Sequence, residues 1–373
     1  MARNRVIYQS EALYVSEDID STTKAKHEQL ERVQSANYSF TINRQDINQY
    51  GQLARIDSIV LDPPTASLDF SYYLTDGFNE RALGFYVQNP TDTAQGQFAS
   101  GHMVNNSGKN FFISTVAEGS DAIDVGGNNI ESIIGLGNAF LSDYTLDLAV
   151  GSLPTVSVTM DCANISADTN LSGDATDISG VNNPAVSLTD GTPKSGELCI
   201  LPVASTGESD ITALRPGDVT IDISNLDGST LTDISGATDT ASIHIQSASL
   251  SIPLSRSELQ RLGTRFPYSR SVDFPVNATL SVNGIVNEVT AGNLANIIDD
   301  SSTKTVTLTI KDTAGANRMI YTLKGCKIDS ESFSSSIGSN KTVDLTISTQ
   351  IGGIGDTDNG VFVSGANNDA VFS

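Results

Sequence analysis

The clearest pattern in the chain is an alternation of apolar and polar residues with a period of two. In the segment VQSANYSFTIN, Tyr38, Phe40 and Ile42 are apolar and the residues between them are polar. Such alternation is typical of a strand with one buried face. The segments TASLDFSYYL and NATLSVNGIV alternate in the same way. The pattern therefore predicts a protein built mainly of half-buried strands.

The alternating segments occur twice, in the same order. Residues 33–70 align with residues 245–282 without a gap at an offset of 212, and ten of these 38 positions are identical. A second pair, residues 136–160 and 323–347, aligns at an offset of 187. Chance similarity between Ser/Thr-rich strands is the alternative, but two ungapped pairs in one order favour an internal duplication. We expect these identical pairs to superpose: Gln34 with Gln246, Gly51 with Gly263, and Gly151 with Gly338.

A short segment after the first strand of each copy has the spacing of a helix. Asn43 and Ser255 stand where a helix begins, each followed three residues later by an acidic residue, as in a capping box. An apolar pair three residues apart follows, and Gly51 and Gly263 stand where a helix ends. Further on, each copy closes on a strand hairpin that turns at Gly-Ser. The spacing predicts helical turns near residues 44–50 and 256–262.

Composition along the chain suggests its organisation. Residues 166–195 are mainly Asp, Asn, Ser and Gly, the composition of a linker, and residues 354–373 are polar and Gly-rich until their last few residues. We expect an all-β fold with two tandem β-sandwich or barrel domains, each with one short flanking α-helix. The expected divisions are a first domain at 1–165, a polar linker at 166–195, a second domain at 196–353 and a C-terminal arm at 354–373.

The chain is strongly acidic, with a formal net charge of -23 over 373 residues. Tight binding of nucleic acid or of an anionic membrane surface requires Lys and Arg, so both are disfavoured. One interpretation of the charge is solubility or a salty habitat, and the other is a surface that must repel DNA. No apolar run suits a signal peptide or a membrane span.

Candidate chemistry is sparse. The sequence has no CxxC, no Cys/His cluster, no GxSxG, no HExxH and no P-loop. His244 stands between two isoleucines in an alternating segment, which indicates a strand-face residue. An acidic pair for glycoside chemistry has no supporting pattern. We therefore assign no catalytic, cofactor-binding or metal residue to the remaining candidates, which are Cys162, Cys199, Cys326, His27 and His102.

One segment, DTNLSGDATD, has the alternate oxygen-bearing side chains that open a calcium loop. The glutamate expected at the twelfth position of such a loop is missing, since Ser179 stands there, and so are helical flanks. A calcium site and an ordinary surface loop are the two interpretations of its side chains, which are Asp168, Asn170, Ser172 and Asp174.

Two segments resemble bacteriophage tail tube proteins, also called major tail proteins. They are LERVQSANYSFTINRQDINQYGQLARID at 30–57 and ESFSSSIGSNKTVDLTISTQIGG at 331–353, a minority of the chain and without a catalytic signature. The resemblance implies a structural, non-enzymatic virion protein whose inner strands join across subunits into a closed barrel around a channel. The family's usual ring is a hexamer of single-domain subunits. Because this chain carries two copies, three chains would make a pseudo-sixfold ring, with a hexamer of whole chains as the alternative.

The resemblance also implies partners and a location. The subunit would stack into the virion tail after folding in the host cytoplasm, and it would contact tail terminator and tail-tip proteins without binding a membrane. Double-stranded DNA would pass through the bore during genome ejection without tight binding, and an acidic wall would keep friction low. A receptor- or carbohydrate-binding adhesin is the alternative, although aromatic residues are only 6% of the chain and Trp is absent.

Overall fold

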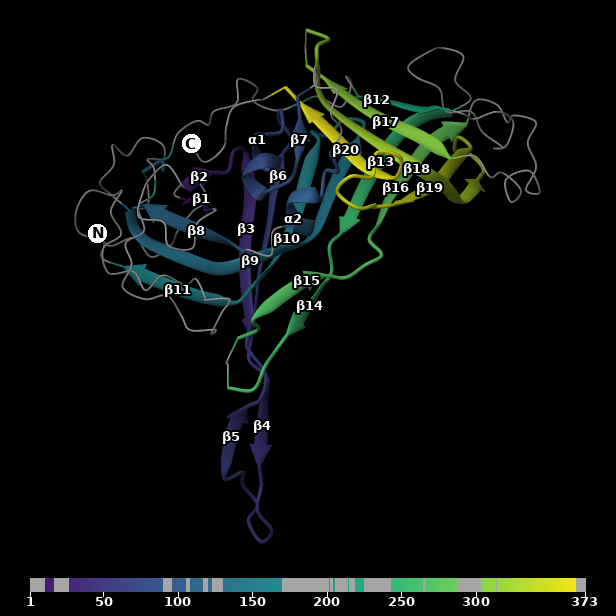
Figure 1. The fold of residues 1–373 in the computed structure, drawn as a ribbon. Helices are drawn as coiled ribbons and strands as arrows, with labels where there is room; N and C mark the ends of the chain where they lie inside the picture. The colour runs from purple at the N-terminus through teal and green to yellow at the C-terminus, as the bar shows by residue number, and fades with distance from the viewer. Residues whose placement is uncertain are drawn as a thin grey trace.

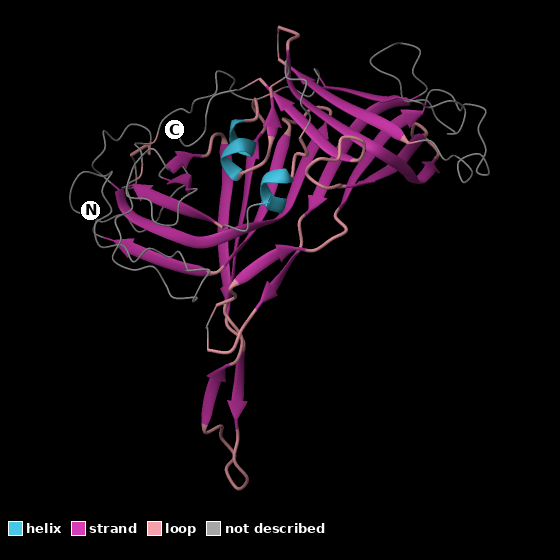
Figure 2. Cartoon of the chain, in the orientation of Figure 1, coloured by secondary structure: helices cyan, strands magenta, loops and turns pink. Residues whose placement is uncertain are grey.

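The computed structural model describes residues 11–16, 27–89, 96–104, 108–116, 120–122, 130–169, 201, 204, 214, 219–224, 243–263, 266–286, 303–312 and 314–366. Within these ranges the chain forms twenty strands and two short helices (Figures 1 and 2). The all-β fold class expected from the alternation is confirmed. None of the helices in this part of the chain is long and apolar enough to cross a membrane.

Eight antiparallel strands form what we call the main sheet. Four come from each copy, and the copies are joined edge to edge because β13 pairs with β9. The expected tandem domains therefore share one sheet. In order across the sheet, the strands are β18 (Asn317–Ser334), β19 (Thr342–Gln350), β16 (Asn277–Val286), β13 (Ile243–Pro253), β9 (Ile130–Ala149), β10 (Thr155–Cys162), β6 (Thr65–Tyr73) and β3 (Val33–Thr41).

The two halves of the main sheet repeat one another in order and in register. Leu146 of β9 lies opposite Val156 of β10, and Phe333 of β18 lies opposite Val343 of β19, which is the same pair shifted by 187. This agreement supports an internal duplication. The identical pairs lie in corresponding elements: Gln34 and Gln246 in β3 and β13, Gly51 and Gly263 in hairpin turns, and Gly151 and Gly338 in the turns before β10 and β19.

Irregularities of the strands also repeat. Ser142 of β9 and Asp329 of β18 are each skipped in the pairing with the next strand, which marks a β-bulge at the same place in both copies. A second matched bulge falls at Gln34 and Gln246. Each glutamine side chain donates from Nε2 to the carbonyl oxygen two residues before it, at 2.9 and 3.3 Å. The identity of these glutamines therefore has a local structural reason.

Strands β9 and β18 are long because each continues out of the main sheet into a side sheet. Each bends at a residue with left-handed backbone, Asn138 (φ 54°) and Gly325 (φ 70°), which are equivalent at the offset of 187. The side sheet of the first copy adds β1 (Glu11–Ser16), β2 (His27–Gln29), β8 (Lys109–Val116) and β11 (Asn164–Thr169) to β9. That of the second copy adds β12 (Val219–Ser224), β17 (Lys304–Lys311), β20 (Gly360–Gly365) and β7 (Val87–Gln88) to β18.

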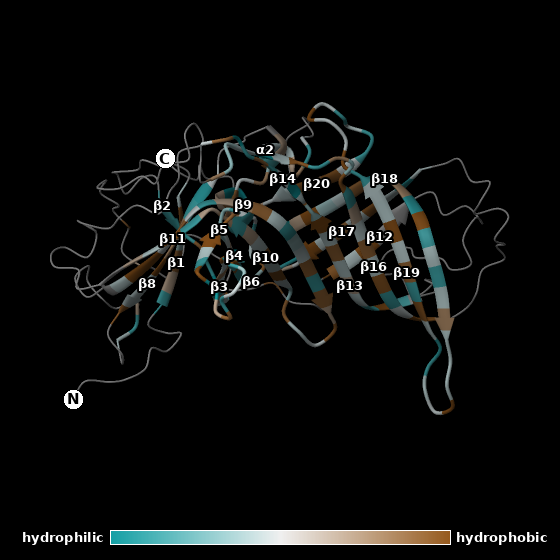
Figure 3. Ribbon diagram, turned by 90° about the horizontal axis from the view of Figure 1, so that it is seen from below, coloured by the Kyte–Doolittle hydropathy of each residue, from teal (hydrophilic) through white to brown (hydrophobic). Residues whose placement is uncertain are grey.

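One face of the main sheet is apolar and buried, and the other is polar. Along β6, Leu68, Phe70 and Tyr72 are buried, while the residues between them are partly or fully exposed. Figure 3 shows the resulting bands of contrasting hydropathy along β13, β16 and β19. The apolar face packs into a hydrophobic cluster that contains residues of both copies, such as Leu146 and Leu308. The two copies therefore share a core as well as a sheet.

The prediction of a helical turn in each copy is wrong. Residues 44–50 and 256–262 belong to strand hairpins, which we call the first hairpin (residues 42–64) and the second hairpin (residues 254–276). The first contains β4 (Arg44–Ile47) and β5 (Asp57–Val60), and the second contains β14 (Arg256–Leu259) and β15 (Ser269–Val272). Figure 1 shows both hairpins projecting from the same end of the main sheet, with the first reaching further.

The helices of the described chain lie elsewhere. Both α1 (Phe78–Leu83) and α2 (Ser100–Val104) belong to the first copy, and the described residues of the second copy contain no helix. The expectation of one flanking helix beside each first strand is therefore wrong. Within the segment expected to be a C-terminal arm, β20 pairs with β18 and with β7 of the same chain. Most of the expected linker, residues 170–195, lies outside the described residues.

Candidate assembly site

The main sheet ends in two strand edges that have no partner among the described residues. Strand β3 pairs only with β6, and residues 327–334 of β18 pair only with β19. An edge strand presents a row of backbone N–H and C=O groups that can pair with another chain. Each edge strand has an equivalent in the other copy, and the structure shows that equivalent paired with a neighbour.

This filled pairing joins β13 to β9, and we call it the seam. It runs from Ser247 opposite Ala149 to Pro253 opposite Asp143. Its side chains also meet, since the Ser249 hydroxyl donates to a carboxylate oxygen of Asp147 at 2.7 Å. Because β13 is equivalent to β3 and β9 is equivalent to β18, the seam shows how the two free edges would fit each other.

Side-chain exposure differs sharply between the filled and the free edge. On β13, Leu250 and Ile252 are 1% and 0% exposed. Their equivalents on β3, Tyr38 and Phe40, are 44% and 62% exposed. Burying an aromatic side chain removes its apolar area from water, which stabilises a contact by a few kcal/mol. Among the described residues, β3 therefore has no neighbour in the place where β13 has β9.

The edge of β18 shows the complementary difference. Leu146 of β9, which meets the seam, is fully buried, whereas its equivalent Phe333 is only partly buried. Aligning the free edges as in the seam sets Tyr38 opposite Phe333, as Leu250 lies opposite Leu146. Two apolar aromatic side chains would then cover each other.

The polar face of the main sheet is made mostly of Ser, Thr and Asn side chains, which bond across strands. The Ser35 and Ser71 hydroxyls lie 2.7 Å apart, and Thr159 donates to a carboxylate oxygen of Asp69 at 2.8 Å. Its charges are mainly negative, although Lys327 lies at one end and the guanidinium groups of Arg256 and Arg270 lie over Phe140, opposite Asp161. The aspartates on this face are Asp69, Asp143, Asp147, Asp161 and Asp344.

A buried polar cluster lies on the opposite, apolar face. Glu80 of α1 accepts hydrogen bonds from the hydroxyls of Tyr72, at 2.8 Å, and Tyr144, at 3.3 Å. The Tyr144 hydroxyl lies 3.0 Å from that of Tyr321. Burial raises the pKa of Glu80 to about 7, although the two hydrogen bonds oppose the shift. This cluster links α1 to strands of both copies.

The second hairpin is fixed to the first copy by two arginines that lie over the same ring, an arrangement we call the arginine clamp. The guanidinium carbons of Arg256 and Arg270 lie 4.9 and 5.6 Å from the centre of the Phe140 ring. Arg256 donates to the carbonyl oxygens of Leu141 and His102 at 3.3 and 3.2 Å. Burial lowers the pKa of Arg256 to about 10, so it remains charged at neutral pH.

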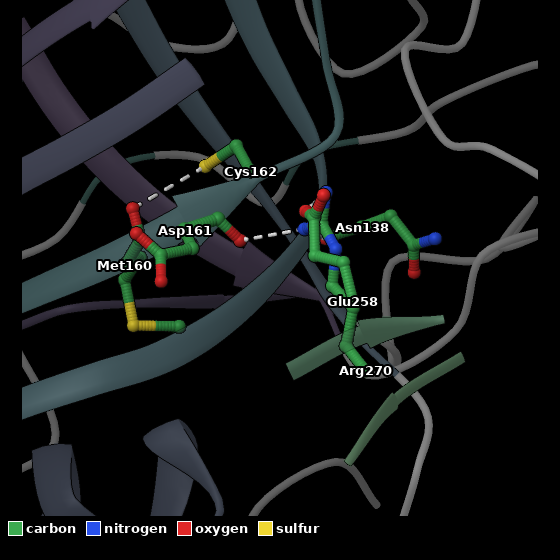
Figure 4. Close-up of polar contacts among 6 residues, drawn as sticks. All are labelled: Asn138, Met160, Asp161, Cys162, Glu258 and Arg270. Atoms are coloured by element: carbon green, nitrogen blue, oxygen red, sulfur yellow. Dashed lines mark hydrogen bonds and ion pairs between the residues drawn. The ribbon is translucent and has the colours of Figure 1, made fainter. Parts of the chain in front are cut away.

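Arg270 completes the clamp from the other strand of the hairpin (Figure 4). Its guanidinium donates to the carbonyl oxygen of Asp161 at 3.1 Å and pairs with Glu258 at 2.9 Å. The Arg270 side chain is only 6% exposed. A buried guanidinium requires such partners, because an unpaired charge is expensive to bury. The clamp therefore holds the second hairpin across the seam.

The candidates from the sequence do not form a chemical site in the described residues. No group of three or more His, Cys, Asp or Glu that could hold a metal occurs there. Burial lowers the pKa of His102 to about 3, and raises that of the Cys162 and Cys326 thiols to about 12. His244 is an exposed strand residue, as expected. Cys199 and most of the candidate calcium loop lie outside the described residues.

Three features were missed at the sequence level: the seam, the clamp and the Glu80 cluster. The identity of Arg44 and Arg256 between the copies was a signal for the clamp, but it did not indicate which residues an arginine there would contact. Glu80 lies in the segment FNERAL, where nothing distinguishes a buried acid from an exposed one. The seam depends on which strands meet, and alternation does not encode that.

No protein-family model and no curated protein matches the chain. Among solved structures, a chain of the anti-feeding prophage baseplate, from a sixfold-symmetrised cryo-EM structure, is 14% identical, with 40% of this chain and 92% of that chain covered and a TM-score of 0.26. A likeness at this TM-score does not establish a shared fold.

Proposed function

We propose that the chain is a structural, non-enzymatic subunit of a bacteriophage tail tube, and that three chains close into a ring through their free edges. The observation that supports closure is the contrast between buried Leu250 and Ile252 at the seam and exposed Tyr38 and Phe40 at the free edge. A neighbour's β18 would cover β3 as β9 covers β13. The family assignment rests on the resemblance of residues 30–57 and 331–353 to tail tube proteins.

The ring would be a closed barrel whose polar face lines the bore. Three chains with eight main-sheet strands each would give about 24 strands, which at a spacing of about 4.8 Å and a tilt of roughly 40° corresponds to a backbone diameter of about 48 Å. Such a channel is wider than a DNA duplex. Its Ser, Thr and Asp lining would offer phosphates little attraction, so DNA could slide through.

Rings would stack axially into the tube. In a head-to-tail contact, the top of one ring binds the bottom of the next, so a further ring can always be added. The subunit would thus act in the virion tail, where tail terminator and tail-tip proteins would contact the ends of the tube. Folding would precede assembly in the host cytoplasm. DNA would be a transient passenger rather than a ligand.

The register of the free edges provides the test. At the seam, Ser249 of β13 lies opposite Asp147 of β9. Their equivalents at the offsets of 212 and 187 are Asn37 of β3 and Ser334 of β18, so these two residues should lie opposite each other between neighbouring chains. Directly opposed strand residues have the Cα separation that a disulfide needs. The variant Asn37→Cys/Ser334→Cys should therefore form disulfide-linked trimers under mild oxidation, seen as closed trimers by native mass spectrometry.

The off-register variant Asn37→Cys/Ser330→Cys is the matched control, because the same offsets set Ser330 opposite Thr41 instead. Equal cross-linking of both variants, or cross-linked rings of six whole chains, would contradict the proposed ring. Discrete monomers that never form rings in negative-stain images would instead favour an adhesin.

A further inference from the structure

The two hairpins of the chain are equivalent in sequence position but not in surroundings. The second hairpin is held by the arginine clamp against the first copy. At the positions equivalent to Arg270, Phe140 and Asp161 of the clamp, the free edges carry other residues, which are Ser58, Lys327 and Ser348. Only Arg44 is retained, as the equivalent of Arg256. A neighbour in the ring could not clamp the first hairpin in the same way.

The first hairpin is also the more apolar of the two. Its tip residues Tyr50 and Leu53 are 104% and 109% exposed, so none of the described residues covers them. Three of its exposed apolar residues are replaced by polar ones in the second hairpin: Leu53 by Arg265, Ile59 by Ser271 and Leu61 by Asp273. An exposed apolar surface of this kind on a projecting element marks an interaction site.

A small apolar cleft lies at the opposite end of the main sheet, where the seam ends. It has a volume of about 60 Å³, and its apolar lining includes Leu148, Val150, Ile221 and Ile245. Strand β13 passes this cleft at its start and leads to a hairpin at its end, so cleft and hairpins lie at opposite ends of the same sheet. In a stacked tube these two ends face each other.

We propose that the duplication has divided the hairpins between two tasks, and that only the first hairpin joins rings. The second hairpin locks the seam laterally. The first hairpin reaches a second copy of this chain in the next ring, where its tip enters the cleft at the end of the seam. This inference rests on the proposed tube. If each chain uses only this tip and this cleft of its described residues, a trimeric ring would make three equivalent axial contacts rather than six.

The test compares Leu53→Asp in the first hairpin with Leu262→Asp in the second. Leu262 is the equivalent of Tyr50 and is also fully exposed, at 104%, so neither variant should disturb folding. We expect Leu53→Asp to form trimeric rings but to lower the fraction that sediments as tubes by about tenfold or more, since a charge would enter an apolar cleft. Leu262→Asp should assemble into tubes as the unmodified chain does. Val150→Asp in the cleft should reproduce the loss.

Three outcomes would overturn the division of tasks. Normal tubes from Leu53→Asp would remove the axial role of the first hairpin. An equal loss of tubes from Leu262→Asp would show that both hairpins join rings. Normal tubes from Val150→Asp would remove the cleft as the acceptor. Failure of the tube proposal itself is distinguishable, because the unmodified chain would then form neither rings nor tubes.

Discussion

At the scale of single residues, Glu80 is a buried group whose ionisation affects stability. The folded state raises its pKa to about 7 from the ordinary value of 4.5. Below pH 4.5 the carboxyl is protonated in both the folded and the unfolded chain. As the pH rises towards 7, the unfolded chain releases the proton first, so the free energy of unfolding falls, and it levels off once the folded chain is ionised as well.

Replacing Glu80 with Gln should remove this part of the pH dependence. Between pH 5 and pH 8 the unmodified chain should lose about 2 kcal/mol more of its unfolding free energy than Glu80→Gln does. Urea unfolding at the two pH values measures the difference. The exposed Asp358→Asn variant should behave as the unmodified chain. An unchanged pH dependence in Glu80→Gln would contradict the assignment.

At the scale of elements, the hairpins show where sequence patterns fail. Apolar residues three apart and a capping pattern suit a helix turn, and they predict helical turns near residues 44–50 and 256–262, where the structure has hairpins. Both hairpins are exposed on each face at their tips, so they lack the alternation that identifies half-buried strands. Cross-strand pairing, such as Arg44 opposite Val60, decided the backbone instead. The glycines taken for helix ends, Gly51 and Gly263, are turn residues with φ of 88° and 91°.

The strands of the main sheet, in contrast, could be recognised from alternation, because each has one face in the core. The repeat also indicated which strands would correspond. The joining of the two copies at the seam could not be inferred, since β9 and β13 both end in similar alternating patterns and pairing between distant strands depends on the whole fold. The same limit applied to the clamp, whose two arginines find partners in the other copy.

The clamp should make a measurable contribution to stability. Arg270→Ala removes the pair with Glu258 and leaves the Asp161 carbonyl oxygen without this donor, so we expect the free energy of unfolding to fall by about 2–3 kcal/mol. The control is Arg55→Ala in the first hairpin. Its ion pair with Asp46, also 2.9 Å long, is exposed on both sides. That variant should cost less than about 0.5 kcal/mol. Equal losses in chemical denaturation would argue against a buried clamp.

At the scale of the whole molecule, the acidic charge matters for the polar face of the main sheet, which would line the bore. We predict that Lys in place of Asp69, Asp147 and Asp344 would make assembled tubes retain DNA, because cationic side chains release counterions from phosphates. The measurement is the amount of nuclease-protected DNA in sedimented tubes at low and high salt, with retention lost at high salt. Asp358→Lys, which lies outside the main sheet, is the control. Similar retention by the control would contradict a bore lined by the polar face.

The matched bulges have a consequence for shape. A bulge bends its strand and increases the local twist, so the bulges at Ser142 and Asp329 give both copies a bend at the same distance along equivalent strands. The left-handed residues Asn138 and Gly325 repeat a second bend. In a closed ring of three chains, the curvatures of the two copies must together span one third of a circle. Loss of a single residue at one bulge would change this sum by altering the bend of one copy, and it would therefore oppose closure of the ring.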